Sequence, residues 1–258
     1  AVGGAVDKLL GERMWTWALL PLGFSSLGVA GFWTVYIVAG NNTPVSPLVS
    51  FPYISDCGTY PPQSCLFGQL LNVGGFTVLV ICLIRYRQVE GYGYHSWINT
   101  LSLLMGVLCA FGATLVGNFQ ETNHLPTHMV GAVLTFGAAV LYFWLQCVLV
   151  LRVRPRHGGL ALAGIRIIAC ILATSTYILA PVFYYEDMRN ASAICEWILA
   201  MDVLLYFGTF AVEFKHITHL GLRLEVDHTC RMNSCNGLMS SASSPLTIPL
   251  PNAHSLPE

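Results

Sequence analysis

Residues 129–150, MVGAVLTFGAAVLYFWLQCVLV, contain no Asp, Glu, Lys or Arg and are long enough to cross a lipid bilayer. A membrane-spanning helix needs about 20 mainly apolar residues. In hydrocarbon, each such segment must satisfy its own backbone hydrogen bonds, as a helix does. The chain has six predicted spans of this kind, at residues 17–39, 66–84, 98–116, 129–150, 167–185 and 194–214. The sequence therefore predicts an all-α integral membrane protein, a bundle of six transmembrane helices.

The composition supports this fold class. Hydrophobic residues make up 55% of the chain and charged residues only 10%, whereas a soluble domain has about 25% charged residues. This difference argues against the alternative, a large soluble helical protein with buried helices. The net charge of −1 indicates no nucleic-acid partner. The partner that the composition implies is the lipid bilayer.

Basic residues are distributed unevenly between the two sides of the predicted bundle. The loops at 40–65, 117–128 and 186–193 contain only Arg189. The remaining basic residues belong to the other side: Lys8, Arg13, Arg85, Arg87, Arg152, Arg154, Arg156, Arg166, Lys215, Arg223 and Arg231. Because cytoplasmic segments retain the Lys and Arg excess, both termini are predicted to be cytosolic.

Three regions are predicted along the chain. Met14 begins the apolar pattern and is a candidate native start, which would make residues 1–13 a non-native N-terminal extension. Residues 14–214 form the six-span membrane domain, whose first span we interpret as an uncleaved signal anchor. Residues 215–258 form a cytosolic tail. From about residue 228 this tail is rich in Ser and Pro and lacks apolar periodicity, so we expect it to be largely disordered.

The predicted outer loops carry residues that an oxidising, glycosylating compartment would modify. Asn41 and Asn190 each begin an Asn-x-Ser/Thr acceptor sequence for glycosylation. Cys57 and Cys65 flank the turn-forming sequence GTYPPQS, and we expect them to form a disulfide. Two free thiols are the alternative. Both features agree with the orientation that the basic residues predict.

Polar side chains at membrane depth are the candidate functional groups, because burying them is costly. Glu196 and Glu213 lie near opposite ends of the last span and are expected to reach water, whereas Asp202 lies about two helical turns inside Glu196. Asp202 has two interpretations. One is an interhelical hydrogen bond to Asn72, Gln69, a hydroxyl or water, which we favour; the other is a proton- or ion-sensing site. The full set of candidates is Gln69, Asn72, Gln146, Glu196, Asp202 and Glu213.

Catalytic and metal-binding motifs are not apparent in the sequence. It contains no phosphate-binding loop, dinucleotide fingerprint, nucleophile elbow or zinc-protease motif. Pro126 lies between His124 and His128 and disfavours the helical spacing of a paired metal site. We therefore expect a protein without enzyme activity, metal or cofactor.

Six short motifs are spread along the chain: FPYISDCG (51–58), PPQSCLF (61–67), GNFQ (117–120), HMVGA (128–132), CEW (195–197) and FGTFAVEF (207–214). Together they resemble the damage-regulated autophagy modulator (DRAM) and transmembrane protein 150 family, over residues 14–214. The cysteine pair and YFWLQ (142–146) are most similar to the transmembrane protein 150B branch. The last motif is also similar to the 150C branch.

The resemblance implies a six-span protein of the plasma membrane and of endosomal, lysosomal or autophagosomal membranes. It also implies modulation of autophagy and of cell survival under nutrient stress, and it carries over no catalytic residues. Three mechanisms are compatible with it. One is a non-catalytic scaffold for proteins or lipids, with a phosphoinositide-kinase assembly as a candidate partner. The others are a mechanosensitive or cation-conducting channel component and an unrecognised membrane enzyme. Short loops and few buried charges favour the scaffold.

Overall fold

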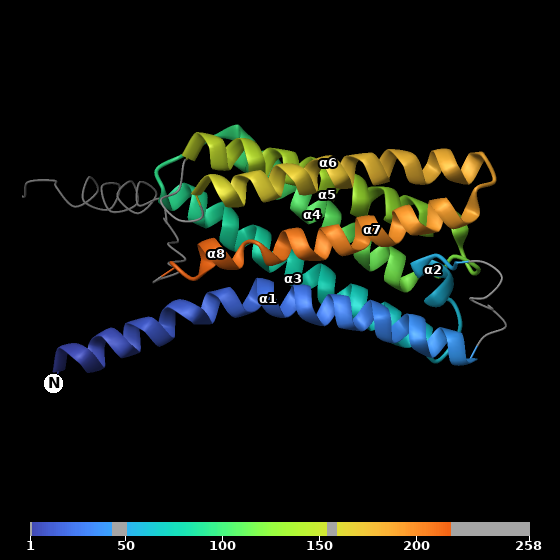
Figure 1. Ribbon diagram of the computed structural model, residues 1–258, viewed down its shortest axis with the longest axis horizontal. Helices are drawn as coiled ribbons and strands as arrows, with labels where there is room; N and C mark the ends of the chain where they lie inside the picture. The colour runs from blue at the N-terminus through green and yellow to red at the C-terminus, as the bar shows by residue number, and fades with distance from the viewer. Residues whose placement is uncertain (1, 43–50, 154–158, 218–258) are drawn as a thin grey trace, which may run out of the picture. The chain divides into compact units, whose positions relative to one another are not determined.

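The computed structural model describes residues 2–42, 51–153 and 159–217, which belong to one compact unit, Ala1–His219. Every regular element in these residues is a helix (Figure 1). The helices are α1 (Val2–Asn42), α2 (Ile54–Cys57), α3 (Gln63–Gly91), α4 (Trp97–Asn118), α5 (Leu125–Val153), α6 (Gly159–Tyr185), α7 (Arg189–Gly208) and α8 (Ala211–Phe214).

Six helical segments are long and apolar enough to cross a membrane. They are Thr16–Asn41, Gln63–Gly91, Trp97–Asn118, Leu125–Val153, Ala161–Tyr185 and Arg189–Phe214, the last of which includes both α7 and α8. Each contains or closely matches one of the predicted spans. The described residues therefore confirm the all-α, six-span fold class.

Several helices continue beyond the apolar stretches that predict them. The second predicted span ends at Ile84, but α3 continues to Gly91. It can do so because Arg85, the first residue past the apolar stretch, is buried at 1% exposure and paired inside the bundle. The next helix begins at a defined cap, since the Ser96 hydroxyl accepts a hydrogen bond from the backbone N–H of Ile98 at 3.2 Å.

Helices α4 and α5 approach closely at two glycines. A Cβ on Gly112 would lie 2.5 Å from the backbone nitrogen of Thr135, and a Cβ on Gly131 would lie 2.9 Å from that of Val116. Lipid supplies no hydrophobic drive for helices to associate, so small residues that bring backbones together are a main source of contact between spans. These glycines therefore set the spacing of the α4–α5 pair.

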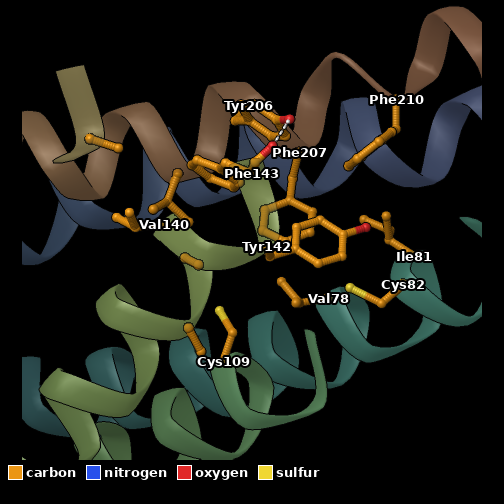
Figure 2. Packing of buried hydrophobic residues seen from close by; sticks show 14 of the residues in the cluster. Val78, Ile81, Cys82, Cys109, Val140, Tyr142, Phe143, Tyr206, Phe207 and Phe210 are labelled. Atoms are coloured by element: carbon orange, nitrogen blue, oxygen red, sulfur yellow. Dashed lines mark hydrogen bonds between the residues drawn. The ribbon is translucent and has the colours of Figure 1, made fainter. Parts of the chain in front are cut away.

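Aromatic side chains of α5 and α7 form the centre of the core (Figure 2). Phe143 stacks on Tyr206 with ring centroids 3.7 Å apart, and Tyr142 stacks on Phe207 at 5.4 Å. The Tyr206 hydroxyl donates a hydrogen bond to the Phe143 carbonyl at 3.1 Å, drawn as a dashed line in Figure 2. This stack fixes the rotation of α7 against α5, and so determines which residues of α7 and α8 face inward.

The orientation of the bundle can be tested with a tag at Glu258. An even number of spans places both termini on one side of the membrane, and the distribution of Lys and Arg predicts that this side is the cytosol. Protease added to the cytosolic face of sealed vesicles should remove the tag. A matched tag between Gln120 and Glu121 should resist digestion until detergent is added. A protected tag at Glu258 together with a digested tag at 120–121 would contradict the orientation.

Candidate functional site

Three charged side chains meet inside the bundle, from α3, α6 and α8. Arg85, Arg166 and Glu213 each have side chains that are 1% exposed. Arg166 Nη1 donates to Glu213 Oε1 at 2.8 Å, and its Nη2 donates to Glu213 Oε2, so the pair is bidentate. Arg85 Nη2 lies 3.3 Å from the same Oε1. We call these three residues the ion cluster.

Neighbouring amide and hydroxyl groups complete the contacts of Arg85. Its Nε donates to Gln146 of α5 at 3.0 Å, and its Nη1 donates to Gln88 at 2.7 Å. Gln146 donates in turn to the hydroxyl of Ser102 on α4 at 2.7 Å. A continuous set of hydrogen bonds thus links α3, α4, α5, α6 and α8 around Glu213.

The ion cluster contains two cations and one anion. The ring centroid of Phe210 lies 4.7 Å from Arg166 Cζ and 5.5 Å from Arg85 Cζ. The face of an aromatic ring attracts a cation, more strongly when both are shielded from water. Arg166 Nε also donates to the Thr209 hydroxyl at 2.9 Å. Even with these contacts, Glu213 is the one carboxylate among the described residues that bonds to both guanidinium groups, so both depend on its charge.

The prediction that Glu213 reaches water is wrong. The two guanidinium groups enclose its carboxylate, and its residue exposure is 1%. Arg85 and Arg166, counted above among the basic residues of one side, are buried as well. The FGTFAVEF motif holds the sequence signal for this site, because a carboxylate within an apolar span is costly and is stabilised by a cationic partner.

The remaining polar candidates at membrane depth lie apart from the ion cluster. Asn72 exchanges two hydrogen bonds with Asn118 of α4, both at 3.0 Å, and Gln69 is exposed. Asp202 is only 8% exposed, and its Oδ2 has no hydrogen-bond partner among the described residues. Asn72, a candidate partner of Asp202, is therefore paired with Asn118 instead. Among the residues that the structure describes, no group of three or more His, Cys, Asp or Glu side chains is placed to hold a metal.

A second set of contacts holds the segment before α3 against the start of α7. The Glu196 carboxylate accepts a hydrogen bond from the Ile54 N–H at 3.3 Å, and the Trp197 indole donates to the Pro52 carbonyl at 3.0 Å. The motifs FPYISDCG and CEW, which are far apart in the sequence, therefore meet in the folded chain. Glu196 thus has a structural role, fixing the short helix α2.

The two glycosylation candidates differ in their surroundings. Asn190 lies in the first turn of α7, where its Oδ1 accepts a hydrogen bond from the Phe51 N–H at 3.0 Å. The Ser192 of this acceptor sequence is buried, and its hydroxyl donates to the Ala180 carbonyl at 2.7 Å. Asn41 is exposed near the end of α1, and its threonine lies outside the described residues. Glycosylation at either asparagine stays a prediction.

Cys57 and Cys65 are separate thiols in the structure. Cys57 ends α2 and is 3% exposed, whereas Cys65 lies in the first turn of α3 and is exposed. Burial raises the pKa of the Cys57 thiol to about 12, and the nearby carboxylates of Asp56 and Glu196 add to this rise. Cys57 is therefore a poor nucleophile in the folded chain. The disulfide stays a prediction.

Comparison with known proteins finds relatives that agree with one another in family. The profile of the Frag1/DRAM/Sfk1/Cwh43P N-terminal domain matches residues 16–217. Modulator of macroautophagy TMEM150B from Xenopus tropicalis is 48% identical over 204 residues, covering 79% of this chain and 89% of that protein. The Homo sapiens protein of that name is 40% identical over 204 residues, covering 78% and 88%. Transmembrane protein 150A from Mus musculus is 35% identical over 233 residues, covering 80% and 86%. No solved structure matches the chain.

Replacing Glu213 should destabilise the bundle strongly. Glu213→Gln keeps the size of the side chain but leaves two buried guanidinium groups without an anion, and such a loss costs about 3–5 kcal/mol of unfolding free energy. Glu90→Gln is the matched control, because Glu90 pairs with Arg87, whose side chain is 52% exposed. Exposed pairs contribute at most about 1 kcal/mol. Thermal unfolding of both variants in detergent measures the difference, and equal losses would refute the role of the ion cluster.

The predicted disulfide can be tested by alkylation of unfolded protein. Unfolding is required because the buried, protonated Cys57 would resist alkylation even as a free thiol. In denaturant without reductant, Cys57 and Cys65 should stay unmodified while Cys82 and Cys109 react. After reduction all four should react. Closure of this short loop would contribute about 2–3 kcal/mol on the chain-entropy estimate. Modification of both Cys57 and Cys65 before reduction would identify them as free thiols.

Proposed function

The chain belongs to the Frag1/DRAM/Sfk1/Cwh43P family, as the sequence resemblance predicts, and we propose that it modulates autophagy as a non-catalytic membrane scaffold. Its effect would be on autophagy and on cell survival under nutrient stress. The relatives named as modulators of macroautophagy, at 40–48% identity, support the process. The geometry of the buried charges supports the scaffold as the mechanism by which the protein acts on autophagy.

The ion cluster is the observation that carries the scaffold proposal. Its groups bond to each other and to Gln88, Gln146 and Thr209, and each of these bonds except Arg85–Gln88, which lies within α3, joins different segments of the bundle. A bundle joined in this way presents fixed surfaces to a protein or lipid partner. A membrane-protein assembly, including a phosphoinositide-kinase assembly, is the class of partner that we propose.

A cation-conducting or mechanosensitive role is the second candidate, and Asp202 is the residue that favours it. Its unpartnered carboxylate oxygen is a group that an ion or proton could use. However, Asp202 and Glu213 are eleven residues apart in the sequence, which corresponds to about 16 Å at the helical rise, and α7 ends between them at Gly208. Between these two acids lie Tyr206 and Phe207 of α7 and also Phe210, which follows α7, each at most 1% exposed. This apolar stack interrupts a polar route between them and makes conduction the weaker proposal.

The proposed locations are the plasma membrane and the endosomal, lysosomal and autophagosomal membranes. They follow from the family resemblance, and six apolar spans are consistent with any of them. Protein neighbours labelled in fed and starved cells would identify which membrane and which assembly the protein joins.

The Asp202→Asn variant separates the two mechanisms. It keeps the shape of the side chain and removes its charge. For a scaffold, overexpression should raise autophagic flux in starved cells equally with the parent protein and the variant, at matched amounts in the membrane. Asp187→Asn is the control, because Asp187 is exposed at the α6–α7 turn with φ 58°, a conformation that Asn tolerates. Loss of both flux and a reproducible membrane current in Asp202→Asn alone would favour conduction.

A further inference from the structure

A cavity of about 340 Å³ lies between α1 and α3. Its lining on α1 follows the helical repeat, with Leu20, Gly23, Phe24, Leu27 and Gly28 all facing it. Glycines help to create the space, since a Cβ on Gly23 would meet nothing within 4 Å. The cavity extends from Leu19 to Phe32 of α1, about 20 Å along the helix axis.

The mouth of the cavity is continuous with the lipid-facing surface of the bundle. Leu27 and Val73, from opposite sides of the mouth, are 71% and 54% exposed. The floor is formed by buried residues of α4 and α7, including Cys109 at 2%, Ala113 at 9% and Val203 at 8% exposure. In a membrane, side chains exposed along the middle of a span face hydrocarbon, so the cavity opens toward lipid chains.

The lining restricts what can occupy this space. The Thr77 and Thr135 hydroxyls, the side-chain hydroxyls that line it, donate to the Val73 and Gly131 carbonyls, both at 2.8 Å. Water needs several polar partners, so this cavity would not retain it. A helix from a second copy is too large, because a helix about 10 Å wide and 20 Å long fills roughly 1,600 Å³.

We infer that this cavity binds one acyl chain of a bilayer lipid. A chain is thin and apolar, and it is present in the medium that the mouth faces. The length of the cavity is comparable with the ~15 Å depth of one leaflet of hydrocarbon. An apolar cavity of about 150 Å³ already binds benzene in another protein, and this one is more than twice that size. An empty cavity would leave its lining atoms without contacts. This binding does not depend on the scaffold function proposed above.

Photo-crosslinking tests this inference. The full-length protein is reconstituted in phosphatidylcholine nanodiscs that include phosphatidylcholine with a diazirine in one acyl chain. After illumination, peptides are analysed for adducts by mass spectrometry. Adducts are expected on the floor residues Cys109, Ala113 and Val203, which lipid outside the cavity cannot reach. Ile168 on α6, 68% exposed, reports on ordinary lipid contact.

Filling the cavity should abolish the floor adducts. Gly23→Leu places a side chain in open space within the cavity, and Gly74→Leu does so from α3, where a Cβ would lie 3.6 Å from Phe24. Gly164→Leu is the control, because Gly164 also faces open space but lies on α6, away from the cavity. Floor adducts should disappear in the first two variants, with labelling of Ile168 unchanged, and should persist in the control.

Three outcomes would overturn the inference. Floor residues could remain unlabelled in the parent protein, or remain labelled in both Gly23→Leu and Gly74→Leu. A diazirine sterol added to the same nanodiscs could label the floor where the acyl probe does not, which would assign the cavity to a sterol instead.

Discussion

The bidentate contact between Arg166 and Glu213, shared with Arg85, is the interaction on which the arrangement of this bundle depends. All three side chains are 1% exposed, so each has lost its water. Desolvated charges are tolerated only when they are paired in good geometry and their remaining hydrogen-bonding groups are satisfied. The structure meets this condition by drawing Gln88, Gln146 and Thr209 into contact with the two arginines. A shift of α3, α6 or α8 would expose a buried charge to hydrocarbon.

The packing around this interaction is uneven, and the unevenness separates two parts of the bundle. The share of the apolar stretch that is buried differs between spans. It is 61% in the last span, which comprises α7 and α8, but 28% in α1 and 17% in α6. The last span is thus the central element, held by the aromatic stack with α5 and by the ion cluster. Helix α1 lies beside α3 at one side of the bundle (Figure 1), and the apolar cavity lies between these two helices. A buried centre with an exposed apolar side agrees with the proposed scaffold role.

The six spans could be predicted from the sequence because each depends only on its own apolar residues. The ion cluster could not, because its contacts depend on how three distant helices rotate and pack. Arg85 illustrates this: it follows an apolar run, so hydropathy assigns it to a loop, and only the proximity of Glu213 explains its place inside the helix bundle. Likewise, Asn72 could be recognised as a membrane-depth polar group, but its pairing with Asn118 required the α3–α4 contact. The motifs FPYISDCG and CEW were visible separately, and their contact through Glu196 and Trp197 was not.

A double-mutant cycle between Arg166 and Glu213 tests the central claim most directly. Unfolding free energies would be measured for Arg166→Met, Glu213→Gln and the double variant in the same lipid or detergent. If the ion cluster holds the bundle together, the double variant should be more stable than the sum of the two single losses predicts. The difference should lie within the range of about 0.5–3 kcal/mol that contacting residues show. Losses that add to within about 0.5 kcal/mol would show that the two residues act independently, and would contradict the account.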